Sequence, residues 1–330
     1  MKQFLTTRWM LGGLAALLIL GYALSLYWSS EPDMFDVSEY ARQRANLNQT
    51  SVVTGYTVTA TLIKVGNTLM DKPGGYLAND VMPPSVMMDD MPAWEFGVLE
   101  VVRDMALAMR NDFSRSQSQS LENPHLVKAQ PLFNIDSRSW LLPSAESKYR
   151  EGTLALERYL HELSDPSADN AQFYVRADNL RQWLQMVQKR MGSLSQRLSA
   201  SVGQERLNTD LAGESKATQS TPGKGSQYMK TSWWKLDDVF YEARGCSWAL
   251  LHLLKAVDAD FANVLENKNA RVSLQQIIRE LESTQQTVWS PMILNGSGFG
   301  LVANHSLVMA NYISRANAAL IDLTELLSQG

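Results

Sequence analysis

Paired carboxylates are the most frequent groups in this sequence that could do chemistry. Adjacent or nearly adjacent acids are plentiful, among them Asp89/Asp90, Asp237/Asp238, Asp258/Asp260 and Glu280/Glu282. One carboxyl of such a pair acts as a general acid only when apolar surroundings raise its pKa. The sequence does not show such surroundings, and solvation at a surface explains nearly all such pairs. They therefore assign no catalytic residue.

Other chemical motifs are equally uninformative. The four histidines, His125, His161, His252 and His305, are far apart, and no two have the H-x-x-x-H spacing of a metal site. The glycine-rich segment 296–300 has no strand–loop–helix context and is read as a plain turn. The nucleophile motif G-x-S-x-G does not occur. We expect no catalytic residue, no metal and no cofactor.

Two surfaces are candidates for binding a partner. On a helix predicted from Leu236, aromatic and basic side chains recur every three or four residues opposite an aliphatic stripe: Tyr241, Arg244, Trp248, His252 and Lys255. This composition is typical of an interface, and it equally fits a second packing face inside a bundle.

The second candidate is a basic face on the helix predicted over 171–202. That helix holds five bases against one acid, namely Arg176, Arg181, Lys189, Arg190 and Arg197 against Asp178. The bases could pair with the acid-rich segment 80–104, remain solvated, or face anionic lipid headgroups or an acidic protein.

One stretch has the composition of a membrane anchor. The eighteen residues from Met10 to Tyr27 include no charge, are mostly aliphatic, and are flanked by Trp9 and Trp28. About 20 apolar residues in a helix cross a bilayer, and Trp is enriched at both of its interfaces. Lys2 and Arg8 precede the stretch and acids follow it. The positive-inside rule therefore predicts a cytoplasmic N-terminus and a body on the other side of the membrane.

The alternative is a cleaved signal peptide with its cut near residues 23–25. Hydrophobicity continues without a break to residue 28, which favours an uncleaved anchor over 10–28. Residues 1–9 would then form a cytoplasmic tail that is too short for a folded output domain. A receptor that signals inward through its own domain is therefore excluded.

Composition excludes a disordered chain and a general nucleic-acid binder. Of the 330 residues, 45% are hydrophobic and 19% are charged, which is enough apolar content for a large core. Without Lys2 and Arg8, 28 basic and 34 acidic residues remain, a net charge of −6, so no nucleic-acid partner is expected. The single cysteine, Cys246, cannot form an internal disulfide and is predicted to be a buried packing residue.

Helical periodicity dominates the first half of the body. Helices are predicted over 50–71, 94–108 and 144–163, with Ser144 as an N-cap. The longest helix is predicted over 171–202, capped by Asp169 or Asn170 and carrying a heptad-like apolar seam. Segment 114–142 is predicted as a long loop, and 29–49 as a tether or a short helix.

The composition changes between 203 and 226, where small and polar residues predict a flexible linker. Beyond it, helices are expected over 236–261, 272–288 and 306–327, with a hairpin or an irregular turn at 292–302. The predicted fold is all-α, with a single transmembrane helix followed by a multi-helix bundle. Its parts are the tail at 1–9, the anchor at 10–28, the tether at 29–49, one helical half at 50–202, the linker at 203–229 and a second helical half at 230–330.

Five short segments carry a family resemblance: KPGGYL at 72–77, WEFGVL at 94–99, DFSRSQSQS at 112–120, FYVRADNL at 173–180 and SLSQRLSASVG at 193–203. They resemble a proteobacterial family catalogued as domain of unknown function number 2333, and the likeness extends over most of the chain, anchor included. The resemblance implies a Gram-negative inner-membrane protein with a periplasmic helical body. It implies no activity, cofactor or catalytic residue.

Three functions remain open. The first is a non-catalytic protein, anchored in the inner membrane, whose periplasmic bundle binds or scaffolds another envelope component or a second copy of itself. The second is a periplasmic enzyme that acts on an envelope polymer through an unidentified carboxylate. The third is a ligand-binding module that signals to a neighbouring membrane protein. A buried carboxylate in an apolar cleft would favour the enzyme, whereas a filled core with an exposed patch would favour the scaffold.

Overall fold

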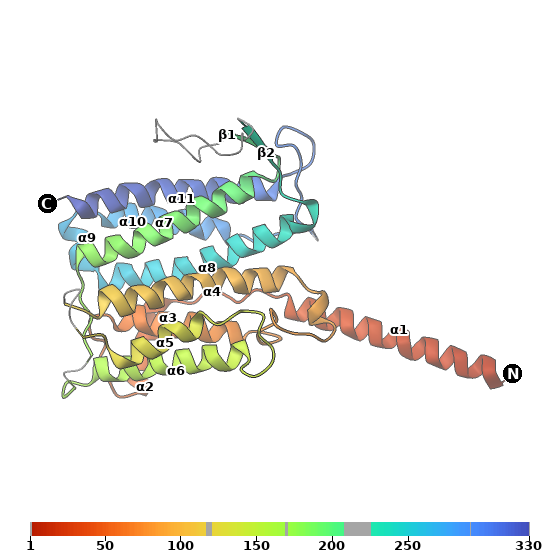
Figure 1. Ribbon diagram of the computed structural model, residues 1–330, viewed down its shortest axis with the longest axis horizontal. Helices are drawn as coiled ribbons and strands as arrows, with labels where there is room; N and C mark the ends of the chain where they lie inside the picture. The colour runs from red at the N-terminus through yellow and green to blue at the C-terminus, as the bar shows by residue number, and fades with distance from the viewer. Residues whose placement is uncertain (1, 117–120, 169–170, 208–225, 291, 330) are drawn as a thin grey trace, which may run out of the picture.

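Helices account for nearly all the regular structure in this chain, which confirms the predicted all-α class. The computed structural model describes residues 2–116, 121–168, 171–207, 226–290 and 292–329. Within these residues it has eleven α-helices and one short pair of strands. Figure 1 shows the helices of the body running roughly side by side, with α1 projecting from one end.

The projecting helix is α1, Lys2–Trp28. Its segment Trp9–Trp28 has a mean hydropathy of 1.9, and none of its most apolar window is buried. By length and composition this helix can cross a membrane, although a signal sequence near an N-terminus has the same properties. Its last turn rests on the body, because the Trp28 ring lies against Gly74, which has a positive φ of 83°.

The centre of the body is a pair of helices, α4 (Asp90–Ala108) and α8 (Leu236–Asp260). They approach closely because each presents a glycine to the other. A Cβ on Gly97 would lie 2.1 Å from the carbonyl oxygen of Glu242, and a Cβ on Gly245 would lie 2.1 Å from that of Trp94. Only glycine permits this backbone contact. A π-helical turn, Met109–Phe113, continues α4.

One layer of helices, all from the first half of the sequence, covers one side of the α4/α8 pair. It consists of α2 (Val37–Leu47), α3 (Tyr56–Asp71), α5 (Pro124–Phe133) and α6 (Ala145–Ser164), with a 3₁₀ turn at Ser85–Met87. Ser144 caps α6 as predicted, since its hydroxyl accepts the Ser147 N–H. The α3 helix is also confirmed, although it starts at Tyr56 rather than at residue 50.

A second layer covers the other side of the pair. It consists of α7 (Ala177–Ser199), α9 (Ala262–Asn267), α10 (Arg271–Thr284) and α11 (His305–Ser328). Between α7 and α8, strands β1 (Gln204–Leu207) and β2 (Ser226–Met229) pair antiparallel, and a 3₁₀ turn follows at Trp233–Lys235. These strands occupy the ends of the predicted linker, while its residues 208–225 lie outside the described residues.

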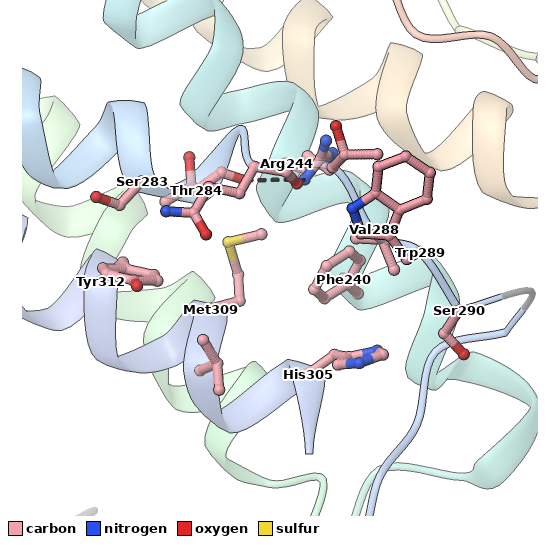
Figure 2. Close-up of a pocket in the computed structure, with 13 residues that line it drawn as sticks. Phe240, Arg244, Ser283, Thr284, Val288, Trp289, Ser290, His305, Met309 and Tyr312 are labelled. Carbon is pink, nitrogen blue, oxygen red and sulfur yellow. Dashed lines mark hydrogen bonds between the residues drawn. The ribbon is translucent and has the colours of Figure 1, made fainter. Parts of the chain in front are cut away.

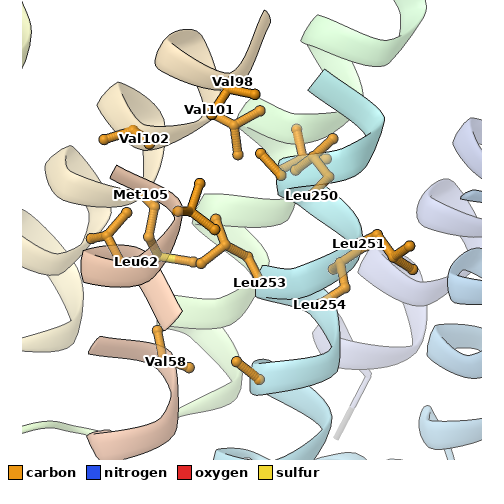
Figure 3. Packing of buried hydrophobic residues seen from close by; sticks show 14 of the residues in the cluster. Val58, Leu62, Val98, Val101, Val102, Met105, Leu250, Leu251, Leu253 and Leu254 are labelled. Carbon is orange, nitrogen blue, oxygen red and sulfur yellow. The ribbon is translucent and has the colours of Figure 1, made fainter. Parts of the chain in front are cut away.

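The buried apolar residues form one cluster that includes both predicted halves of the body. Figure 3 shows α3, α4 and α8 contributing side chains to the same region, among them Leu62, Met105 and Leu253. Helix α8, from the predicted second half, therefore packs directly on α3 and α4 from the first. Burying these apolar faces against one another is the main favourable term in folding such a bundle.

Two predicted elements were wrong. Segment 114–142 is not a long loop, because it contains α5, which Asn123 caps through the N–H groups of His125 and Leu126 and which Pro124 begins. The helix predicted over 171–202 starts only at Ala177, and at 23 residues it is shorter than α8, which has 25. Its apolar seam from Leu180 to Leu198 is buried as predicted.

The antiparallel course of the helices places their connections at two opposite ends. We call the end from which α1 leaves the α1 end; it holds segments 72–89, 134–144, 200–207, 226–235, 285–290 and 292–304 (Figure 1). A hydrogen bond of 2.8 Å from Asn79 Nδ2 to the Ser139 carbonyl joins two of these segments. The opposite end, the far end, holds the described residues of segments 48–55, 114–123, 165–176 and 261–270.

Candidate functional site

Arg244, from the predicted partner face of α8, is buried in a network that joins three parts of the chain. Its Nε donates to both carboxylate oxygens of Glu31 at 2.6 and 2.7 Å. Its other nitrogens donate to the carbonyls of Thr284 at 3.0 Å, Gln286 at 2.8 Å and Gln285 at 3.3 Å. Arg244 thus satisfies carbonyls at the C-terminal end of α10, where a cation is favoured.

His252 anchors the segment that follows α1. Its Nδ1 donates to the Trp248 carbonyl at 2.8 Å, so the neutral ring leaves Nε2 free to accept the Phe35 N–H at 3.1 Å. The Phe35 ring stacks on the imidazole with centroids 4.1 Å apart. Burial lowers the pKa of His252 to about 4, and the charge of Lys255 acts in the same direction.

The predicted partner face therefore meets the chain's own segment 31–35. Arg244, Trp248 and His252 are buried, while Tyr241 and Lys255 are half-buried at its two ends. The sequence allowed either an external interface or internal packing for this face. The three central residues, Arg244, Trp248 and His252, pack inside the protein. The predicted tether, segment 29–49, forms α2 and this contact with α8.

Glu31 and Phe35 are contacts of the α8 face that the sequence interpretation missed. Phe35 is an aromatic residue in a polar segment, and that was the only available signal. Glu31 stands among other acids and has no distinguishing pattern. Its partner Arg244 lies 213 positions away.

Two bases of the predicted basic face of α7 form ion pairs with the central helices. Arg190 holds Asp104 with two contacts, of 2.6 and 2.9 Å, and holds Glu100 with a third of 2.7 Å. Arg197 pairs with Glu242 of α8. Both pairs join α7 to the central helices, so the pairing with the acid-rich segment 80–104 is present for Arg190.

The other three bases of that face have different surroundings. Arg176 precedes α7 and donates to the carbonyl of Ser116. Arg181 lies 3.8 Å from Asp178 on its own helix, and Lys189 is exposed. The five predicted residues therefore do not form one continuous basic surface.

A buried ion pair lies beneath the α1 end. The Lys72 ammonium is 2.6 Å from Glu95 Oε1, and both side chains are fully enclosed. Glu95 also accepts the N–H groups of Leu77 and Ala78, each at 2.8 Å, and Lys72 donates to the Gly75 carbonyl. Burial raises the pKa of Glu95 to about 7, although these donors favour its charged form. This carboxylate is enclosed and has no access for a substrate.

Four carboxylates from two of the predicted pairs converge at the α1 end. Burial, and then the charges of Asp89, Asp237 and Asp238, raise the pKa of Asp90 to about 7. Such a group can hold a proton that its neighbours do not. The two acids of the predicted pair Asp258/Asp260 have separate partners. Asp260 caps α3 by accepting the Val58 N–H at 2.8 Å.

The remaining acids of the predicted pairs make ordinary ion pairs, Asp258 with Arg271, Glu280 with Arg315 and Glu282 with Lys255. Among the described residues, no group of three or more His, Cys, Asp or Glu side chains could hold a metal ion. Cys246 is buried as predicted, and burial raises the pKa of its thiol to about 12. It is therefore a packing group and not a nucleophile.

A cavity of about 350 Å³ lies at the α1 end between α8, α10 and α11. Figure 2 shows Phe240, Met309, Tyr312 and His305 around this space, with Val288, Trp289 and Ser290 at the right of the view. We call it the α8–α11 groove. Its size falls at the lower end of the range for ligand pockets. Val288, Trp289 and Val308 add further apolar surface.

Most polar side chains that line the α8–α11 groove are of types that carry no charge. Arg244 borders it, but Glu31 balances the guanidinium charge. His305 Nδ1 accepts the Leu294 N–H at 3.2 Å, so a neutral ring carries its proton on Nε2 and can donate a hydrogen bond. The groove therefore suits an apolar group that carries a hydrogen-bond acceptor. Because Arg244 also holds the carbonyls of Thr284 and Gln286, it links the groove wall to the segment after α1.

These features define a class of protein, a multi-helix bundle with one N-terminal helix able to cross a membrane and a small apolar groove near that helix. The chain belongs to the bacterial family DUF2333, whose description is an uncharacterized protein conserved in bacteria and whose profile matches residues 2–330. The predicted family is thereby confirmed over nearly the whole chain. No curated protein and no solved structure matches the chain.

Proposed function

We propose that this protein is a non-catalytic scaffold of the cell envelope. In this proposal α1 anchors the chain in the inner membrane, and the periplasmic body binds an apolar side chain of another envelope protein in the α8–α11 groove. The observation that carries the proposal is the groove itself, an apolar cavity of about 350 Å³ at the end of the body from which α1 leaves.

The lining of the groove supports a protein partner. Phe240, Val308 and Met309 offer apolar contact, and Trp289 stands at its edge with 92% of its surface exposed. Interface hot spots typically consist of an aromatic or aliphatic anchor that fills a pocket of this kind, surrounded by neutral polar groups. Ser283 and Thr287 supply such groups at the margin.

The charges around α1 support the proposed orientation. Lys2 and Arg8 precede the apolar span, and Glu31, Asp33 and Asp36 follow it. Because basic residues are retained on the cytoplasmic side, this order favours a body in the periplasm. The contacts of Glu31 and Phe35 with α8 leave little free chain between the anchor and the body. A partner bound in the groove would thus be held at the membrane surface.

Site-specific photocrosslinking in cells tests the groove. A photoreactive amino acid in place of Val308, which lines the groove, should crosslink a discrete envelope protein, or a second copy of this chain if the partner is itself. The matched control is Val272, an exposed aliphatic residue at the other end of α10, which should give no such product. Ser283→Trp, which fills the groove, should abolish the crosslink. A product that survives this change, or that also forms from position 272, would rule out the groove.

A fusion of alkaline phosphatase to the C-terminus tests the orientation. The enzyme is active only where its disulfides form, so activity is expected from a periplasmic body. The protein should also remain with the membrane fraction after a high-salt wash. An inactive fusion would reverse the orientation, and release into the soluble periplasm would show that α1 is cut as a signal sequence.

A further inference from the structure

The tryptophans of this protein fall into three groups by environment. Of the nine in the sequence, Trp94, Trp183 and Trp248 are buried in the core. Trp9 and Trp28 bracket the apolar span of α1. The other four are more than half exposed, and we call them the tryptophan collar: Trp140, Trp233, Trp234 and Trp289.

All four collar residues lie at the α1 end, although they come from three separate connections. Trp140 lies between α5 and α6, Trp233 and Trp234 lie just before α8, and Trp289 lies between α10 and α11. The same end holds other large exposed apolar side chains, among them Met87, Leu142, Met292, Phe299 and Leu301. Figure 1 shows these connections gathered at the end from which α1 projects.

The far end differs. Among the described residues of its connections 48–55, 114–123, 165–176 and 261–270, the large apolar side chains that are mostly or nearly half exposed are Val52 and Leu121, and none of them is aromatic. Single exposed apolar residues are normal on a soluble protein, but a collection of them on one surface marks a contact with another apolar phase or protein. The asymmetry between the two ends therefore requires a specific explanation.

We infer that the tryptophan collar is inserted into the headgroup layer of the membrane that α1 crosses. This inference depends on the proposal that α1 is retained as an anchor. An anchor that leaves the body at this end must place the end against the bilayer surface, since Trp28 at the end of the span already rests on Gly74 of the body. Tryptophan is the residue best suited to that layer, because its ring is largely apolar and its N–H remains near water.

Attraction to anionic lipid is not the main cause, because the charges at the α1 end are mainly acidic. Among its described residues the acids Asp80, Asp89, Asp90, Asp136, Asp237 and Asp238 outnumber the exposed bases, among them Arg138, Lys230 and Lys235. An acidic cluster is not attracted to a negatively charged surface. Insertion should therefore come from apolar contact, occur on zwitterionic lipid, and persist at high salt.

Fluorescent labels on single cysteines test this inference in the full chain, reconstituted in zwitterionic phosphatidylcholine vesicles with or without brominated acyl chains. The only native cysteine, Cys246, is buried and does not compete for the label. Every position chosen is at least half exposed, so the label does not disturb the core.

Labels at Trp289→Cys and Phe299→Cys should show blue-shifted emission and quenching by brominated lipid, unchanged by high salt. Labels at Leu47→Cys and Val272→Cys, on or next to the far end and 84% and 77% exposed, should show neither. Quenching of a label at Leu17→Cys, in the middle of α1, reports whether the anchor itself is inserted. If Leu17 is quenched and the two α1-end positions behave like the far-end controls, the inference is overturned while the anchor stands. If Leu17 is not quenched, the anchor proposal fails, and the inference fails with it.

Discussion

Acidification should destabilise the folded protein through His252, whose contact with the segment that follows α1 requires a neutral ring. The neutral ring accepts the Phe35 N–H at Nε2 and donates to the Trp248 carbonyl through Nδ1. A protonated ring has donors on both nitrogens and cannot accept the Phe35 N–H. Between about pH 7 and about pH 5 the folded protein therefore keeps the ring mostly neutral, whereas an ordinary histidine in the unfolded chain gains its proton.

The size of the effect follows from the shift in the pKa of His252. Burial lowers this pKa from 6.5 to about 4 in the folded protein. The unfolded chain then binds the proton more tightly than the folded one, so stability is present above the unfolded pKa and is lost as the pH falls towards 4. Between pH 7 and pH 5 the free energy of unfolding should decrease by about 2 kcal/mol through this one group.

Denaturant unfolding of the full chain in detergent micelles, followed by tryptophan fluorescence at both pH values, measures this loss. The control is His252→Gln, which cannot titrate, while His125, His161 and His305 remain in both proteins and contribute equally. Wild type should lose about 2 kcal/mol more than His252→Gln between the two pH values. An equal loss in both proteins would show that the ring is not held neutral and would refute the reasoning.

Three substitutions in the core have outcomes that unfolding measurements can check. Trp248→Ala truncates a buried aromatic side chain and should cost about 3–5 kcal/mol; a loss below about 1 kcal/mol would mean that the ring is exposed. Glu95→Gln leaves the enclosed Lys72 ammonium without a counter-charge and should also cost about 3–5 kcal/mol, most of it recovered when Lys72→Met is added. Gly97→Ala places a Cβ 2.1 Å from a carbonyl oxygen of α8 and should cost about 1–3 kcal/mol, whereas Gly192→Ala, with nothing closer than 3.7 Å, should not destabilise the fold.

The success of the sequence interpretation depended on how local each signal was. Helices α4, α6, α8 and α11 were predicted because their apolar residues repeat with helical spacing. The α5 helix was missed because its ten residues are too few to show a clear helical repeat. Asn123 followed by Pro124 is a signal for a helix start that the sequence does contain. The start of α7 was placed too early because Phe173 continues the apolar seam in sequence. In the structure Phe173 instead packs on Phe113 and Phe261 from an extended segment.

The candidate site was predictable only in part. The α8 face was recognised from its spacing, but the same spacing fits an external partner and an internal one, since periodicity reports only that a helix face is distinctive. Glu95 gives a signal that was available: it lies between Met91 and Leu99 on a helix face that is otherwise apolar. The groove gave none, because its walls come from α8, α10, α11 and the segment 283–290.

The sequence by itself determined the all-α class, the apolar span at the N-terminus, the buried cysteine and the family, because each depends on composition or on spacing within a short stretch. Only the tertiary structure decided what the helix faces meet. Glu31 and Arg244 are 213 positions apart, and Arg190 and Asp104 are 86 apart. Charged side chains have many partners of opposite sign in a chain of this length, and which pair forms is settled by the packing of the helices that carry them. The collar of exposed tryptophans at the α1 end arose in the same way, from connections that become neighbours only when the bundle is assembled.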